Sequence, residues 1–293
     1  MIKEAQQAIL RTIAYSDVFA YPLTKKELWH FLLDKKTSRK EFEKALKTVS
    51  LVITEKDGFY CFLGREDIIA KRKQREKVSY EKIKIAKRTL PFFSWIPTVR
   101  LIGISGALAM NNADKNDDID LFVVVRKNSL WTTRLFILLI LQCLGLRRKR
   151  KEKNPSDKIC LNMLFDERAL GLPKEKQDLF GAHEVVQMMP IFERGDAYGR
   201  FIRANLWVKK FLPNSLDIKR LSYKDIKRSK NHNFLITQLL NSFEFLAKVL
   251  QLWYMRKHRT IEIISDHMLA FHPLDHRQKI LKEYNKRLRQ YQI

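Results

Sequence analysis

The sequence predicts an α+β protein in which a small mixed sheet lies between helical segments. Helix-capping patterns and a hairpin pattern occupy residues 1–64, and apolar runs of strand character occupy residues 98–185. Helical periodicity dominates residues 186–293. At 293 residues the chain exceeds the usual size of one domain, so we expect more than one domain.

Residues 1–64 are expected to form three short helices and a hairpin. A helix is expected around Glu4–Tyr15, and the sequences at Thr24–Glu27 and Ser38–Glu41 have the capping-box spacing that marks helix starts. The β-prone runs LVIT and FYCFL then flank the turn EKDG, which is typical of a hairpin. This order of elements resembles a winged helix, a module that contacts DNA in some proteins and protein partners in others.

Residues 65–97 are expected to connect this segment to the sheet. The stretch from Arg65 to Leu90 is a charged helical run with a sparse apolar side. Pro91 and Pro97 then bracket PFFSWIP, which marks a boundary after the helix.

Residues 98–185 are expected to hold the sheet. Val99–Ile104 and Leu121–Val125 are short and β-branched, as strands covered on both faces are. Leu130–Leu146 follows as an apolar helix. Its most apolar stretch, Leu135–Leu146, is too short for an ordinary membrane span, so we expect a buried helix. Lys158–Phe165 follows as a third strand.

The loop between the first two strands is polar and anionic, and packing alone gives no reason for it. Residues two apart in a strand project from the same face, so Asp118 and Asp120 can bind the same divalent ions. Upstream, the glycines Gly103 and Gly106 let the backbone approach phosphate groups closely. Two carboxylates with bound Mg²⁺ can hold a triphosphate for in-line displacement at its α-phosphorus.

These residues are similar to the pattern of the nucleotidyltransferase superfamily, whose core resembles that of DNA polymerase β. The family carries a Gly-Ser turn followed by Asp-x-Asp at the start of a strand, and here Gly106 with Ala107 and Asp118–Asp120 stand at those positions. The resemblance covers roughly residues 100–165. The whole layout looks like that of bacterial members that join a winged helix, this core and a helical tail.

The resemblance implies a transferase that moves a nucleoside monophosphate from a nucleoside triphosphate to an acceptor and releases pyrophosphate. Asp118 and Asp120 would be the catalytic metal ligands for Mg²⁺ or Mn²⁺, and Gly103, Ser105 and Gly106 would shape the phosphate loop. The acceptor stays open between tRNA, another nucleic acid, a protein side chain and a small molecule.

The sequence departs from the family pattern at two positions. Ala107 replaces the serine whose hydroxyl reaches a phosphate, and Asn162 stands at the possible third position, where a carboxylate is usual and where an amide cannot accept a proton. Asp166 and Glu167 lie just beyond, where solvation of the strand end is the simpler role. The alternative function is therefore a catalytically silent nucleotide sensor or nucleic-acid-binding regulator.

The basic excess favours polyanionic partners. Lys and Arg exceed Asp and Glu by 57 to 32, although a solvated Lys-rich surface is the alternative. The run at Arg147–Lys153 fits contact with a nucleic-acid backbone or a triphosphate and equally fits a solvated loop. Candidate contacts on the capped helices are Lys35, Lys36, Arg39, Lys40, Lys44 and Lys47.

The remaining segment, residues 186–293, is expected to be a helical domain. Its aromatic stripe is most simply core, or else packs on a partner helix, and comprises Phe234, Phe243, Phe245, Trp253 and Tyr254.

The cysteines and the N-terminal residues indicate a cytoplasmic protein without a membrane partner. Cys61, Cys143 and Cys160 are scattered in apolar stretches, where buried free thiols are expected. The first residues have charges and glutamines where an export signal needs an apolar run. No feature indicates an oligomeric state.

Overall fold

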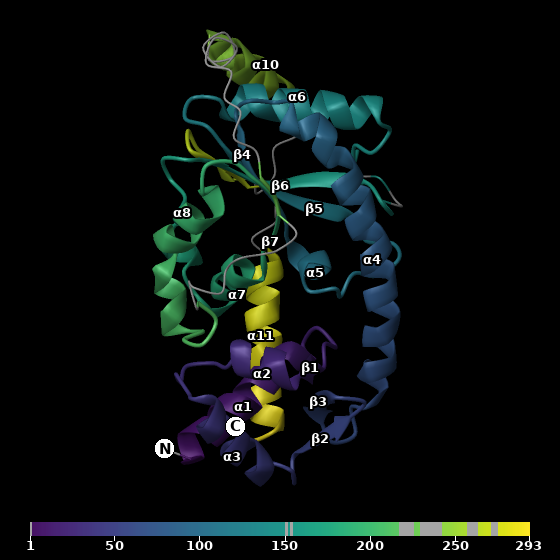
Figure 1. The fold of residues 1–293 in the computed structure, drawn as a ribbon, viewed down its shortest axis with the longest axis vertical. Coiled ribbons are helices and arrows are strands. Elements are labelled where there is room, and N and C mark those ends of the chain that lie inside the picture. Colours follow the sequence, from purple (N-terminus) through teal and green to yellow (C-terminus); the bar gives the residue numbers. More distant parts are fainter. Residues whose placement is uncertain are drawn as a thin grey trace.

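The computed structural model describes residues 2–149, 152, 155–216, 226–228, 242–256, 263–270 and 275–293. These residues form helices and two sheets, in agreement with the predicted α+β class. In Figure 1 the larger sheet lies in the upper half and the N-terminal segment lies at the bottom. The long helix α4 runs between them along one side.

The N-terminal segment contains three helices and a sheet of strand order β1-β3-β2. Its elements are α1 (Ile2–Asp17), β1 (Leu23–Thr24), α2 (Lys25–His30), α3 (Arg39–Thr48), β2 (Ile53–Lys56) and β3 (Phe59–Phe62). Thr24 and Glu27 form a complete capping box, and the Ser38 side chain accepts a hydrogen bond from the N–H of Glu41. Gly58, with φ at 79°, lies in the turn between β2 and β3. The expected helix starts and hairpin are confirmed.

Helix α4 (Asp67–Ser94) continues through Pro91, so the expectation that the helix ends before this proline is wrong. Pro91 has no N–H and removes one helical hydrogen bond. Leu90 and Phe93, on either side of it, are buried in the core beneath the larger sheet. Their burial offsets the lost hydrogen bond and keeps the helix on the sheet.

The larger sheet has the strand order β8-β7-β4-β5-β6-β10-β9. Its strands are β4 (Val99–Ile104), β5 (Ile119–Val125), β6 (Ile159–Asp166), β7 (Met189–Glu193), β8 (Lys227–Arg228), β9 (Ile263–Ile264) and β10 (Met268–Ala270). β5 and β6 are parallel, whereas β4 is antiparallel to both of its neighbours, β5 and β7. The three expected strands are confirmed. Strands β7, β8, β9 and β10 come from residues 186–293, so the prediction of a helical segment there is incomplete.

Side chains of β5 alternate between two cores. Val123 and Val125 face one cluster, which includes residues of α4, α6 (Leu130–Cys143) and α10 (Glu244–Arg256). Phe122 and Val124 face the other cluster, on the opposite side of the sheet. The helices contributing to that second cluster include α7 (Leu179–Gln187), α8 (Ala197–Ala204), the 3-10 helix η2 (Leu206–Lys210) and α11 (Asp275–Gln290). The strand is therefore covered on both faces, as its composition predicts.

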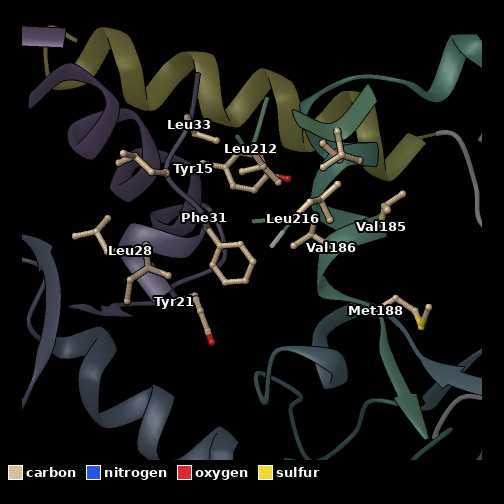
Figure 2. Close-up of a cluster of buried hydrophobic side chains, with 14 of the residues drawn as sticks. Tyr15, Tyr21, Leu28, Phe31, Leu33, Val185, Val186, Met188, Leu212 and Leu216 are labelled. Atoms are coloured by element: carbon tan, nitrogen blue, oxygen red, sulfur yellow. The ribbon is translucent and has the colours of Figure 1, made fainter. Parts of the chain in front are cut away.

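The second cluster also contains the cores of α1, α2 and α3, so the N-terminal segment and the sheet share one core. Figure 2 shows Tyr15, Leu28 and Phe31 of the N-terminal segment on one side of this cluster. Val185 and Val186 of α7 lie across from them.

Helices α6 and α10 pack together but leave an apolar outer surface. The Glu244 carboxylate accepts hydrogen bonds from the N–H groups of Trp131 and Thr132 at the start of α6. The expectation that α6 is buried holds for only part of the helix, because Phe136 and Leu139 are exposed. The expectation of an aromatic core on α10 is wrong for Phe243, Phe245, Trp253 and Tyr254, which are all more than half exposed. Phe234 lies outside the described residues.

The three cysteines occupy different environments. Cys61 is buried as expected, Cys160 is partly buried, and Cys143 is exposed, contrary to the prediction. Cys143 is the last residue of α6. In the described part of the chain, no helix combines the length and apolar character that a membrane crossing requires.

Candidate functional site

A cavity of about 640 Å³ lies between the larger sheet and the N-terminal segment. Its walls come from the start of β5, the short helix α5 (Gly106–Ala109), α7, α11, the end of α1, and the segments on either side of α2. It opens on the face of the sheet toward which Phe122 and Val124 project. Because Asp118 and Asp120 have the same parity along the strand as Phe122, they project into it.

The sequence places the acid pair at the point where a polar loop enters the sheet. Asp120 lies in β5, Asp118 directly precedes the strand, and both line the cavity. Ile119 between them is fully buried in the opposite core, as expected. The loop before them is fixed by Lys82 of α4, whose buried ammonium donates to the carbonyls of Lys115 at 3.0 Å and Asp117 at 2.7 Å.

The Ser105–Gly106 turn lies against Asp120. The N–H of Ser105 donates to the Asp120 carbonyl at 2.9 Å. Gly106 has φ at 66°, a left-handed conformation that favours glycine. A Cβ added to Gly106 would lie 3.0 Å from Oδ2 of Asp120, so this carboxylate contacts the backbone of the turn. Ser105, Gly106 and Asp120 are thereby brought together as the sequence suggests.

Gly103 lies elsewhere, within β4 and outside the cavity lining. An added Cβ would meet the Sδ atom of Met188 at 2.2 Å, so glycine here allows Met188 to pack closely on the strand. The structure therefore gives Gly103 a packing role in place of the expected position in the loop.

Cys160, and not Asn162, is the neighbour of the acid pair on the next strand. β5 and β6 pair Asp120 with Cys160, and ligand atoms of Asp118, Asp120 and Cys160 all lie within 4.8 Å of one another. The register then shifts, because Leu121 pairs with Leu161 while Phe122 pairs with Met163. Asn162 falls in this irregularity, is fully buried, and donates from Nδ2 to the Ser105 hydroxyl at 3.0 Å.

The two carboxylates of the acid pair lie close to each other and have little positive charge near them. Burial, followed by the charge of Asp118, raises the pKa of Asp120 to about 8. Arg148 donates from Nη1 to Oδ2 of Asp118 and is the basic group closest to the pair in the described part of the chain. Burial, followed by the charges of Asp120 and Asp118, raises the pKa of the Cys160 thiol to about 12, so this thiol is protonated at neutral pH.

The two carboxylates fit a divalent cation. Oδ1 of Asp120 is buried and has no hydrogen-bond partner, which is costly unless a cation or ligand meets it. Carboxylate oxygens are the hard ligands that Mg²⁺ and Mn²⁺ prefer. Cys160 does not suit Mg²⁺, because sulfur is a soft ligand and this thiol keeps its proton. Asp118 and Asp120 are thus the residues that would hold Mg²⁺ or Mn²⁺.

The cavity also contains ionisable residues that sequence reasoning missed. Burial raises the pKa of Glu184 to about 7 and, with a smaller effect of His30, lowers the pKa of His183 to about 3. Tyr15 of α1 stacks on the His183 ring with a centroid distance of 4.1 Å. In sequence, His183 and Glu184 belong to an ordinary helical pattern far from the acid pair. Only the packing of α7 against α5 brings them into the cavity.

The other candidate positions are separated from the pair, except for Arg148. Asp166 lies at the far end of β6 and pairs with Arg168 at 2.7 Å, whereas Glu167 pairs with Arg200 at 3.1 Å. Of the basic run at 147–153, Arg148 lines the cavity beside Asp118. Residues 150, 151 and 153 lie outside the described residues.

Comparison of the chain with protein-family models, curated proteins and solved structures finds no match.

Proposed function

We propose that the protein is a divalent-metal-dependent nucleotidyltransferase that transfers a nucleoside monophosphate to an acceptor with release of pyrophosphate. The observation that carries this proposal is the contact between the Gly106 backbone and the carboxylate of Asp120, beside Asp118 on the wall of a large cavity. Two adjacent carboxylates for a cation and a close backbone for phosphate oxygens, in one place, suit a metal-bound triphosphate.

Each residue has a distinct role in this proposal. Asp118 and Asp120 hold Mg²⁺ or Mn²⁺, which supplies positive charge to the phosphate oxygens. Ser105, Gly106 and Ala107 present the turn that phosphates approach, and Asn162 braces this turn through the Ser105 hydroxyl. Arg148 adds a guanidinium beside Asp118, in reach of the same phosphates.

The finer architecture belongs to the same proposal. The three helices and the hairpin of residues 1–64 support a winged-helix-like domain, joined by residues 65–97 to a core at 98–185 and a C-terminal domain at 186–293. Exposed Lys40, Lys44 and Lys47 around α3 support nucleic acid as a further partner. Free cysteines support a reducing, cytoplasmic location.

A second function, a silent nucleotide sensor, is favoured by one observation. The neighbour of the acid pair is the Cys160 thiol, and the next polar side chain along β6 is the Asn162 amide. Neither is a carboxylate that could complete the metal site or accept a proton at neutral pH. A protein of this kind binds the triphosphate through Asp118 and Asp120 and transfers nothing.

The test measures binding and transfer separately. Calorimetry with each of the common nucleoside triphosphates and Mg²⁺ or Mn²⁺ is expected to show binding that Asp118→Asn with Asp120→Asn abolishes. Pyrophosphate release with labelled acceptor supports the transferase, and metal-dependent binding without release supports the sensor. Unchanged nucleotide affinity in the double variant would contradict both.

A further inference from the structure

The part of the cavity that faces the N-terminal segment has walls from distant parts of the chain. Tyr15 comes from α1 and Phe31 follows α2, whereas His183 and Glu184 come from α7. Figure 2 shows Tyr15 and Phe31 on the side of the N-terminal helices, facing α7. This surface joins aromatic faces to ionisable groups, which is the composition of a site for a small organic ligand.

Polar groups on this wall lack partners. His183 is 4% exposed, and its Nε2 atom is buried without a hydrogen-bond partner. Its other nitrogen, Nδ1, lies 3.0 Å from the side-chain amide of Gln187. Glu184 and Lys176 also line the cavity, and neither forms an ion pair with another described residue. Burial raises the pKa of Glu184 and lowers the pKa of Lys176, so each gains from a ligand that meets its polar group.

The N-terminal segment is fixed over the cavity by contacts with the rest of the chain. Arg287 of α11 donates to Asp17 at 2.6 Å, and the rings of Phe62 and Tyr291 stack with centroids 3.6 Å apart. A nucleic-acid duplex or a folded protein would have to displace α1 and α11 to deliver a reacting group to this part of the cavity. A small molecule fits without that displacement, because a volume of about 640 Å³ is within the range of small-ligand sites.

We propose, on the premise of the proposed function, that this part of the cavity is the acceptor subsite. Its acceptor is a small molecule that carries a hydroxyl or amino group on an apolar body. The apolar body packs on Tyr15 and Phe31, and the polar groups meet His183, Glu184 and Lys176.

The reaction balances with these groups. The acceptor oxygen or nitrogen forms a new bond to the α-phosphorus of the nucleoside triphosphate. The bond from that phosphorus to the bridging oxygen breaks, and pyrophosphate leaves with the electron pair. The proton of the acceptor passes to the Glu184 carboxylate, which lines the same cavity as the acid pair.

The first experiment compares two classes of acceptor. The full chain is incubated with Mn²⁺, α-phosphate-labelled ATP, GTP, CTP and UTP, and either the dialysable or the retained fraction of a cell extract. Label is expected on a compound of the dialysable fraction. Label on retained nucleic acid or protein alone overturns the inference, as does bound nucleotide without label in either fraction. Absence of metal-dependent nucleotide binding overturns the proposed function itself.

The second experiment uses matched variants. Glu184→Gln and Lys176→Met are compared with Glu175→Gln and Lys174→Met, whose side chains are exposed outside the cavity. Glu184→Gln is expected to lower kcat about a hundredfold, because an amide cannot accept the acceptor's proton. Lys176→Met is expected to raise the KM for the dialysable acceptor about tenfold or more, and both variants should keep a nucleotide Kd and an unfolding midpoint close to the parent's. A tenfold weaker nucleotide Kd in these variants would assign this wall to the nucleotide and overturn the inference, while leaving the transferase proposal intact.

Discussion

Asp120 holds its proton to an unusually high pH, and this has a measurable effect on stability. Burial and Asp118 raise its pKa to about 8, whereas an aspartate in the unfolded chain titrates near 3.9. The folded state therefore binds more protons than the unfolded state between these values, and the contribution of Asp120 to stability is lost as pH rises through this window. Without metal, Asp120→Asn is expected to be the more stable protein at pH 8, by about 1 kcal/mol or more.

Urea unfolding in a chelator at pH 6.5 and pH 8 measures this difference. Glu184 has a similarly raised pKa, but it is present in both proteins and cancels in the comparison. Asp67→Asn, at an exposed position, is the control and should not change the pH dependence. Equal pH dependence of the parent and Asp120→Asn would show that Asp120 is ionised in the folded protein.

Substitution of Cys160 tests which residue occupies the third position beside the acid pair. Cys160→Asp places a third carboxylate beside Asp118 and Asp120, so Mg²⁺-dependent transfer is expected to rise, because an oxygen ligand replaces a thiol beside the cation site. Asn162→Asp is expected to give no such gain, because it places a charge in a fully buried position that braces Ser105. Single-turnover transfer assays separate the two. A gain in Asn162→Asp and none in Cys160→Asp would show that the third position is Asn162.

Helix α4 contains an internal proline, Pro91, that its packing tolerates. Pro91 is exposed and removes the hydrogen bond that its N–H would donate within the helix. Pro91→Ala is therefore expected to stabilise the protein by about 1–3 kcal/mol. Thermal and urea unfolding measure the change, with Lys87→Ala on the same exposed side as the control. A loss of stability would indicate that the proline is needed to direct the chain into β4.

Elements with strong local signals were predictable from the sequence. Thr24 and Ser38 mark helix starts because capping depends on residues three apart, and the turn at Asp57 and Gly58 needs positive φ at both positions. β7 was missed because it is short, contains Pro190 and is buried, so it shows no alternation. β8, β9 and β10 have two or three residues each, too few for any pattern.

The candidate site likewise contains residues that local spacing brings together and residues that only tertiary packing brings together. Asp118, Asp120 and Gly106 lie within one strand-loop-strand unit, so their spacing alone brings them together. The family resemblance places the third position at Asn162, but the direct neighbour of Asp120 on β6 is Cys160. His183 and Glu184 depend on tertiary packing between α7, α5 and α1, which no local pattern encodes.

At the scale of the whole molecule, Asp17 joins three distant parts of the chain. Its carboxylate is 2% exposed and accepts from Arg65 at 2.9 Å and from Arg287 of α11 at 2.6 Å. Asp17→Ala leaves two partly buried guanidinium groups without this partner, and we expect a loss of about 3–5 kcal/mol in the free energy of unfolding.

The control for Asp17 is an exposed ion pair of the same segment. Glu43 pairs with Lys25 at 3.4 Å, with both side chains substantially exposed. Glu43→Ala is expected to cost about 1 kcal/mol or less. Urea unfolding followed by tryptophan fluorescence and by circular dichroism compares the two variants. Similar small losses in both would mean that the contacts of Asp17 are screened by water and do not tie the N-terminal segment to α11.

The packing of α1 against α11 also bears on how the protein is synthesised. Tyr15 meets Tyr284 at a ring distance of 5.5 Å, so an early part of the chain completes its core with residues translated much later. Contacts of such long sequence separation form slowly, and an emerging chain must keep its unmatched apolar surface from associating with other molecules meanwhile. Until α11 leaves the ribosome, the apolar side of α1 that it covers is a natural target for a chaperone.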